Sequence, residues 1–258
     1  MKGLEVLDCL QGHPGLSITE IAGQLGLYKS RVMRICGTLE HMGYVVFDPR
    51  ERVYRLGPRI PSLARSYEAT NPLMGVVTPF LESIFGRLRQ SVAFHRVHGD
   101  TLMCVYRLNV SSGSYDQTPT WQDRSLYCGA RGRVMLAFGS EELRESFLSR
   151  DEDFPRLTPY TVTSPTELQE AVERAREQGY AISSQERVIG QLGIAAPVFQ
   201  YGNHLVGVIS ISGRVENFDD EFVNRAVPIL LEETRKLSLR LGAEDHFGEK
   251  TDREGASE

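Results

Sequence analysis

The sequence predicts an α+β fold in two domains, and three stretches of the chain carry that prediction. Residues 17–44 show helical spacing twice, residues 44–56 look like a short hairpin, and residues 91–212 contain apolar strand-like runs between helical segments. The chain has 258 residues, of which 41% are hydrophobic, so it is long enough for two cores of ordinary size. We therefore expect a small N-terminal domain and a larger domain with helices packed on an antiparallel sheet.

The N-terminal part is predicted to hold three helices. The first ends at Gly12-His13-Pro14-Gly15, a strong helix breaker. The next two have apolar residues at i, i+3, i+4 and i+7, namely Ile18, Ile21, Ala22 and Leu25, then Val32, Ile35, Cys36 and Leu39. Ser17 with Glu20 indicates a capping box, and Gly26 indicates a left-handed helix end before a sharp turn. This arrangement is typical of a helix-turn-helix.

The residues left on the outer side of the last of these helices are cationic or hydrogen-bonding, which suits phosphates and base edges in a major groove. An ordinary helical hairpin would also explain such a face. However, residues 44–56 then form a hairpin that turns at residues 48–52 and carries arginines, as a DNA-contacting wing would. We therefore predict a winged helix-turn-helix that binds double-stranded DNA through Ser17, Lys29, Ser30, Arg31, Arg34, Thr38, Arg50, Arg52 and Arg55.

Charge and cysteine content narrow the class of protein further. The net charge is −5, but the first 70 residues carry +2 and the remainder −7, so the basic end is the expected DNA end. The cysteines, Cys9, Cys36, Cys104 and Cys128, form no C-x-x-C pair, which argues against a zinc ribbon or a disulfide framework. Neither a membrane span nor a signal peptide is apparent. We expect a cytoplasmic protein with no metal and no cofactor.

The rest of the chain is predicted to alternate helices and strands. A linker helix over 59–70 leads to a helix over 73–90 and to strands over 91–97 and 101–108. A polar segment, 109–124, contains the only tryptophan, Trp121, and is expected to be mobile or to contact a partner. The expected domain limits are 1–58 for the winged domain, 59–72 for the linker, 73–242 for the second domain and 243–258 for a disordered tail.

Later elements are marked by their ends. A Gly-rich loop, 128–133, precedes a short helix, and Ser164, Pro165 and Glu167 predict the start of another helix that stops at Gly179. Two apolar strands, 193–199 and 205–212, flank the turn 201–203, and their unbroken apolar character predicts a sheet covered on its faces. A last helix is expected from the cap Asp219 to Gly242.

With these motifs in place, the chain resembles the IclR family of bacterial transcriptional regulators over nearly its full length. The matching stretches are 25–32, 39–44 and 54–57 in the first domain, and 132–137, 178–181, 194–198 and 209–213 in the second. The resemblance implies a GAF-like effector-binding domain and control of an operon by a small molecule. It also implies an operator-binding homodimer or dimer of dimers, for which Ala64 and Tyr67 on the linker helix are candidate pairing contacts.

The resemblance also suggests where an effector binds. Ser210 and Ser212 match positions whose hydroxyls bind effector in several relatives, and two such residues share one face of a strand. Ser183 and Gly193 stand where several relatives carry an acidic residue and a cysteine, which argues against a glyoxylate- or pyruvate-type effector. The loop sequence Gly-Arg-Val is closer to relatives that respond to aromatic acids.

Arg131 stands at a loop position where relatives mostly carry a small or apolar residue. Its guanidinium would bind a carboxylate, and Tyr127 would pack on the body of the effector. The alternative is that Arg131 points to solvent or pairs with an acidic residue. We expect a small organic acid, with aromatic acids among the candidates, bound by His95, Tyr127, Cys128, Gly129, Ala130, Arg131, Ser183, Gly193, Ser210 and Ser212.

A less favoured hypothesis is a sensor or enzyme fused to the winged domain. Cys128 beside a Gly-rich loop would be its nucleophile and His95 or His98 its base. A metal site built from Cys104, Cys128, His95 and His98 is disfavoured, because these residues show no ligand spacing. The effector, the operator and the choice between repression and activation do not follow from the sequence.

Overall fold

The computed structural model describes residues 2–70, 72–99, 101–110 and 126–244. Nearly all of the polar segment 109–124, with Trp121, and nearly all of the tail 243–258 therefore lie outside the described residues. The chain divides into two compact units, the first running to Gly75 and the second starting at Val76. The finer domain limits given above stay a prediction.

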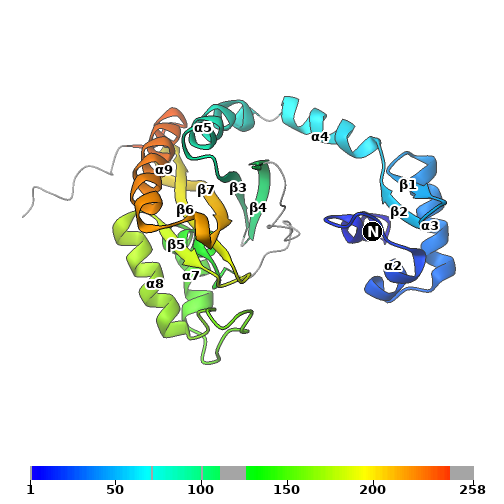
Figure 1. Ribbon diagram of the computed structural model, residues 1–258, viewed down its shortest axis with the longest axis horizontal. Coiled ribbons are helices and arrows are strands. Elements are labelled where there is room, and N and C mark those ends of the chain that lie inside the picture. Colours follow the sequence, from blue (N-terminus) through cyan, green and yellow to red (C-terminus); the bar gives the residue numbers. More distant parts are fainter. Residues whose placement is uncertain (1, 71, 100, 111–125, 245–258) are drawn as a thin grey trace, which may run out of the picture. The chain divides into compact units, whose positions relative to one another are not determined.

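The first unit is a three-helix domain with a wing (Figure 1). It contains α1 (Lys2–Leu10), α2 (Ile18–Leu25), α3 (Lys29–His41), β1 (Val45–Asp48) and β2 (Val53–Leu56). The capping box of α2 is confirmed, since Ser17 Oγ accepts from the Glu20 amide at 3.3 Å and Glu20 Oε2 accepts from the Ser17 amide at 2.8 Å. Gly26 has φ 62°, the left-handed conformation that the turn requires.

The wing is fixed to the helices by its backbone. β1 and β2 are antiparallel with Val45 opposite Leu56, and Leu16 pairs with Tyr54 from outside the hairpin. Gly57, just after the wing, lies so close to Gly43 that a Cβ would stand 2.4 Å from the Gly43 carbonyl oxygen. A glycine is therefore required where the chain leaves the wing.

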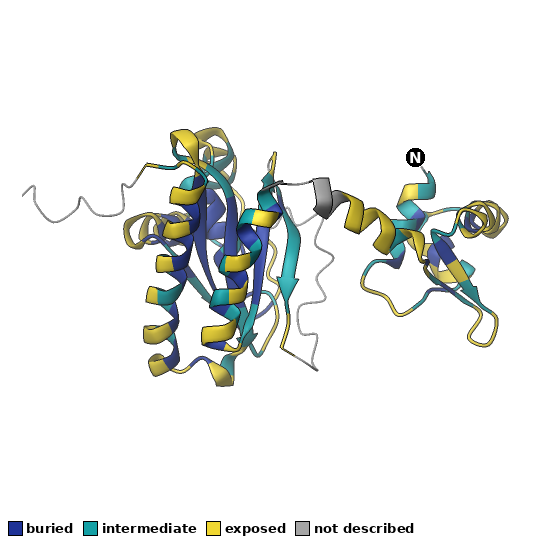
Figure 2. Cartoon of the chain, turned by 90° about the horizontal axis from the view of Figure 1, so that it is seen from above, coloured by how far each residue is buried: buried dark blue, intermediate teal, exposed yellow. Residues whose placement is uncertain are grey.

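Two helices follow, α4 (Arg59–Thr70) and α5 (Pro72–Leu88). The helix predicted over 59–70 is thus present. None of residues 59–66, whose side chains are described, is buried, and Leu63 is 47% exposed (Figure 2). The apolar stripe of α4 at Ile60, Leu63 and Ala64 is consequently left largely uncovered within a single chain.

The second unit is built on a five-stranded antiparallel sheet with the order β4-β3-β7-β6-β5. Its strands are β3 (Ser91–His98), β4 (Thr101–Leu108), β5 (Ala181–Ser184), β6 (Gln191–Gln200) and β7 (His204–Arg214). Its helices are most of α5, from Val76 on, and α6 (Ala130–Phe138), α7 (Glu141–Leu148), α8 (Pro165–Gln178) and α9 (Asp220–Arg240). Short 3-10 turns over Tyr201–Asn203 and Val215–Asn217 follow β6 and β7.

Helices cover both faces of this sheet, as its apolar strands predict. Ala195 and Val208 share a buried cluster with α6 and α8. Successive strand residues point to opposite faces of a sheet, so Ile194 and Ile209 lie on the face opposite to Ala195 and Val208. This is the face on which α9 packs against β6. Arg87 of α5 donates to Glu232 of α9 at 3.0 Å and to Glu233 at 3.3 Å, which ties these two helices together.

Several sequence expectations are corrected. Residues 130–133 are not a loop but the first turn of α6. The glycine at 132 allows this turn to pack closely on the preceding segment, because a Cβ there would stand 2.1 Å from the Leu126 carbonyl oxygen. α7 and β5 were not predicted. Ser164 precedes α8 without making a side-chain cap hydrogen bond. The cap of α9 is confirmed, since Asp219 Oδ1 accepts from the Phe222 amide at 2.8 Å.

Candidate functional site

The outer side of α3 presents the predicted DNA-facing residues together. Val32 and Cys36 are fully buried, and burial raises the pKa of the Cys36 thiol to about 11. The exposed residues of the helix include Lys29, Ser30, Arg31, Arg34 and Thr38. Two exposed apolar side chains were missed by the sequence analysis: Tyr28, which is 85% exposed at the N-cap, and Met33, which is 56% exposed. The exposure of Met33 could have been predicted from the sequence, because helical spacing places it outside the apolar stripe of α3.

The wing turn presents Arg50 and Arg52 to solvent. Asp48 Oδ1 accepts from the Arg50 amide at 2.9 Å and the Glu51 amide at 3.3 Å, and these bonds hold the pKa of Asp48 below its usual range. The turn is therefore well ordered by its own side chain. Arg52 has φ 58°, which places it at the sharp corner of the hairpin.

Two of the residues that are expected to contact DNA also make contacts within the domain. The Arg55 guanidinium binds the Glu51 carboxylate, lies 3.5 Å from Asp48 Oδ2, and donates to the Pro14 carbonyl. Its charge is thus largely neutralised inside the wing. The Ser17 hydroxyl donates to Glu20 Oε2 at 2.7 Å in addition to its capping role. Both side chains therefore help to hold the fold of the domain, and their contact with DNA stays a prediction.

In the second unit, strand register gathers four of the ten predicted effector residues on one face. Ser183 lies opposite Gly193, Gly193 opposite Ser212, and Ser210 opposite Ala195. Residues directly opposite each other in antiparallel strands share a face, and so do residues two apart. Ser183, Gly193, Ser210 and Ser212 therefore line the face that α6 covers. A Cβ on Gly193 or Gly129 would stand 3.7 or 3.8 Å from Ser183 Oγ, so these positions adjoin.

A buried polar contact links this face to α6. His95 Nε2 lies 3.0 Å from Ser210 Oγ and 3.2 Å from Arg131 Nη1, and the histidine is 2% exposed. A guanidinium can only donate, so Nε2 is the acceptor and the ring proton is on Nδ1. The pKa of His95 is held well below its ordinary value, mainly by burial and also by the positive charges of Arg131 and Arg107. His95 is therefore neutral at physiological pH.

The corner that begins α6 is organised by a residue that the sequence analysis missed. Glu186 is buried, and its carboxylate accepts from the Gly129 amide at 3.1 Å and from Arg133 Nη2 at 2.6 Å. Its carbonyl accepts from Cys128 Sγ at 3.4 Å. Gly129 has φ 92°, which permits the sharp entry into α6 beside Ala130. Nothing local in the sequence marks Glu186, because its partners lie far away along the chain.

Tyr127 packs against other aromatic side chains. Its ring is stacked on Phe154 with centroids 4.6 Å apart and an interplanar angle of 5°, and its hydroxyl donates to the Pro155 carbonyl at 2.9 Å. The side chain is buried in the cluster beneath α6. Tyr127 is therefore part of the core, and a contact between its ring and an effector stays a prediction.

The nucleophile hypothesis finds little support in these contacts. The Cys128 thiol is buried and donates to a backbone carbonyl, while His98 is exposed at the end of β3. Within the described ranges, no group of three His, Cys, Asp or Glu side chains is placed to hold a metal ion. The same part of the chain contains no helix of the length and apolar character that crossing a membrane requires.

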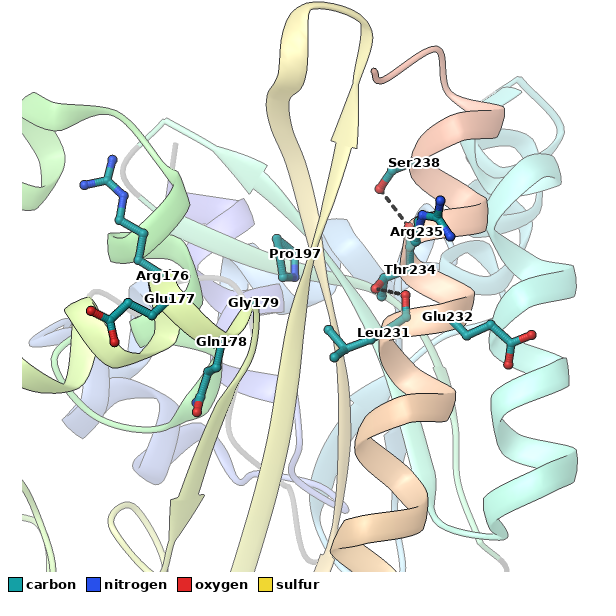
Figure 3. A pocket seen from close by; sticks show the side chains of 10 residues that line it. All are labelled: Arg176, Glu177, Gln178, Gly179, Pro197, Leu231, Glu232, Thr234, Arg235 and Ser238. Atoms are coloured by element: carbon teal, nitrogen blue, oxygen red, sulfur yellow. Dashed lines mark hydrogen bonds between the residues drawn. The ribbon is translucent and has the colours of Figure 1, made fainter. Parts of the chain in front are cut away.

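A groove of about 530 Å³ lies away from these residues, between the end of α8 and α9 (Figure 3). Pro197 of β6 forms its floor at a sheet edge where pairing with β5 has stopped at Ala195. Proline suits this unpaired edge because it has no backbone N–H that would need a partner. Two residues further along β6, the Phe199 amide donates to Ser238 Oγ of α9 at 3.0 Å. None of the predicted effector residues lines this groove.

A winged helix-turn-helix with a basic outer helix, joined to a sheet domain with a buried polar corner, defines a DNA-binding regulatory protein. Comparison with known families agrees. The family described as IclR helix-turn-helix domain matches residues 1–49, and the family described as bacterial transcriptional regulator IclR C-terminal matches residues 66–239. The chain belongs to the IclR family of bacterial transcriptional regulators, whose members are regulators and not enzymes.

Individual relatives are similar over almost the whole chain. An uncharacterised HTH-type transcriptional regulator of Haemophilus influenzae is 25% identical, covering 95% of this chain and 93% of its own. The Pca regulon regulatory protein of Pseudomonas putida is 26% identical, covering 93% and 82%. The crystal structure of the IclR regulator of Alicyclobacillus acidocaldarius has 25% identity and a TM-score of 0.77, covering 93% of this chain and 98% of its own.

A fourth comparison concerns a structure with a bound ligand. An IclR homologue of Microbacterium hydrocarbonoxydans, solved in complex with 4-hydroxybenzoate, has 22% identity and a TM-score of 0.74. It covers 94% of this chain and 98% of its own, and at this identity it shows the shared fold.

Proposed function

We propose that a small organic acid controls operator binding by this regulator, and that it binds where α6 meets the β3 and β7 face of the sheet. The observation that carries the proposal is the buried contact of Arg131, His95 and Ser210. Arg131 and Arg107 both act on His95 with positive charge. The carboxylate at the start of α6, Glu186, is already paired with Arg133. Arg131 thus brings a guanidinium to this corner, the group that can bind a carboxylate with two parallel hydrogen bonds.

Polar groups beside this contact complete the proposed site. Ser183 and Ser212 add hydroxyls in the row that contains Gly193, a position that has no side chain of its own to cover them. The relative from Microbacterium hydrocarbonoxydans holds 4-hydroxybenzoate, which supports an aromatic acid as the first compound to test here. The proposed effector contacts are therefore His95, Cys128, Gly129, Ala130, Arg131, Ser183, Gly193, Ser210 and Ser212.

Calorimetry with 4-hydroxybenzoate, benzoate and pyruvate tests this proposal. We expect at least one acid to bind the full-length protein and to change its affinity for DNA. Arg131→Met keeps the aliphatic stem but removes the charge, and should abolish detectable binding of that acid. Arg174→Met is the matched control, because Arg174 is exposed on α8 and pairs with Glu170. Unchanged binding by Arg131→Met would place the effector elsewhere.

We propose further that the regulator acts in the cytoplasm as a homodimer or a dimer of dimers, paired through α4. The apolar stripe of Ile60, Leu63 and Ala64 is largely uncovered in one chain, and a second copy would bury it. Two winged domains joined in a dimer can also contact two DNA half-sites at once, which supplies the DNA contacts that one winged domain lacks. The side chain of Tyr67, another candidate contact, lies outside the described part of the helix.

Sedimentation of the wild type, Leu63→Glu and Ser62→Glu tests the pairing. Leu63→Glu places a charge on the stripe and should shift the protein towards monomer. Ser62 lies on the opposite side of α4, so Ser62→Glu should leave the assembly intact. A wild-type protein that sediments as a monomer both free and on DNA would exclude the dimer.

A further inference from the structure

The outer side of α3 carries an apolar side chain within its polar surface. Met33 is 56% exposed, although Val32 and Cys36 already supply the packing of this helix on its domain. Met33 lies four residues from both Lys29 and Gly37, so these three positions stack along one side of the helix. Ser30 and Arg34 occupy the adjoining row. Met33 is thus part of the surface that faces DNA rather than part of the core.

Gly37 gives a second observation on the same row. A Cβ at this position would meet nothing within 4 Å, and the backbone does not adopt a positive φ there. Neither packing nor strain therefore requires glycine, although glycine weakens a helix relative to alanine. Its missing side chain leaves the helix backbone open beside Met33, so that a group from outside the domain can approach closely there.

From these two observations we propose that the Met33 and Gly37 row of α3 reads thymine C5-methyl groups in the major groove. Thymine presents a methyl group there, so it is the base that an apolar side chain can select. The methionine thioether is soft and flexible and adapts to such a surface. Lys29 and Arg34 flank the row with positive charge, which draws the helix to the DNA backbone and to guanine edges.

This inference rests on the DNA-binding function of the family and is independent of the effector proposal. The ligand that we propose for this row is the methyl groups of duplex DNA, because Lys29 and Arg34 border the apolar row with positive charge. A second copy of the domain seated on the same row is the competing explanation. That explanation predicts that Met33→Ala alters the oligomeric state.

The experiment uses duplexes that the full-length wild type selects from a random pool. Single thymines in each half-site are then replaced by deoxyuridine, which removes only the methyl group. We expect one position at which this replacement weakens wild-type binding about fourfold, the value of one buried methyl-sized group. The same replacement should have no effect on Met33→Ala, and it should keep its effect on Met33→Leu.

Met42→Ala is the matched control, since Met42 is 55% exposed but lies at the C-cap of α3. It should retain the full deoxyuridine effect. Gly37→Ala should raise the unfolding temperature yet weaken binding, whereas Gly86→Ala, at an equally open position on α5, should leave binding unchanged. The proposal is overturned if deoxyuridine affects the wild type and Met33→Ala equally, if no thymine shows an effect, or if Met33→Ala changes the sedimentation of the free protein.

Discussion

Arg133 Nη2 lies 2.6 Å from Glu186 Oε1, and both side chains are buried under the start of α6. The second oxygen of Glu186 accepts from the Gly129 amide, and Arg133 Nη1 donates to the Ile182 carbonyl at 2.8 Å. This pair therefore joins α6 to the end of β5 and fixes the corner that carries Arg131. The Nε of Arg133 is buried without a hydrogen-bond partner among the described residues, so the pair depends on its two remaining nitrogens.

Glu186→Gln should destabilise the second unit strongly, because it leaves the Arg133 charge buried and uncompensated. The expected loss is about 3–5 kcal/mol in the free energy of unfolding, measured by urea denaturation followed by circular dichroism. Glu170→Gln is the control. Glu170 and Arg174 form an exposed pair at 3.6 Å, and its loss should cost less than about 1 kcal/mol. Equal effects of the two substitutions would contradict the role assigned to Glu186.

His95 predicts a dependence of stability on pH. Its pKa is well below the ordinary value in the folded chain, mainly through burial, whereas an unfolded histidine titrates near about 6.5. Below that pH the unfolded state takes up a proton that the folded state does not. Stability should therefore fall as the pH drops below about 6.5, with a limiting slope of about 1.4 kcal/mol per pH unit from this group.

The measurement is urea denaturation between pH 7.5 and 5, compared between the wild type and two variants. His95→Gln should flatten the slope over this range. His98→Gln, which changes an exposed histidine at the end of the same strand, should keep it. If His95→Gln retains the wild-type slope, another group is responsible.

Two helical glycines should respond to alanine with opposite signs. Gly132 in α6 packs against Leu126, where a Cβ would stand 2.1 Å from a backbone oxygen, so Gly132→Ala must displace backbone and should cost about 1–3 kcal/mol. Gly86 in α5 meets nothing within 4 Å, and Gly86→Ala should stabilise by up to about 1 kcal/mol. Thermal unfolding of both variants tests this, and a stable Gly132→Ala would contradict the packing of α6.

Local signals explain which features the sequence predicts correctly. The capping box of Ser17 and Glu20 and the left-handed Gly26 depend on neighbouring residues, and both are confirmed. Residues 130–133 were wrongly predicted as a loop because a glycine that allows close packing, such as Gly132, looks the same in sequence as one in a loop. β5 was missed because four residues are too few to show an alternation. The pairing of Glu186 with Arg133 spans 53 residues, so it arises only from the folded topology.

The arginines of the winged domain should separate into three kinds when each is replaced by alanine. Arg31 and Arg34 are exposed on α3, and each substitution should weaken binding to the selected duplex by roughly 1–3 kcal/mol if the side chain reads a base. Arg50 is exposed on the wing, so Arg50→Ala should weaken binding to all duplexes alike and lower the salt dependence by about one phosphate contact. Arg55 binds Glu51 and the Pro14 carbonyl, so Arg55→Ala should lower thermal stability while leaving the salt dependence unchanged.

Fluorescence anisotropy at several salt concentrations, on selected and scrambled duplexes, distinguishes the three kinds of arginine. Wild-type affinity for both Arg31→Ala and Arg34→Ala at matched salt would mean that α3 is not the helix that reads DNA.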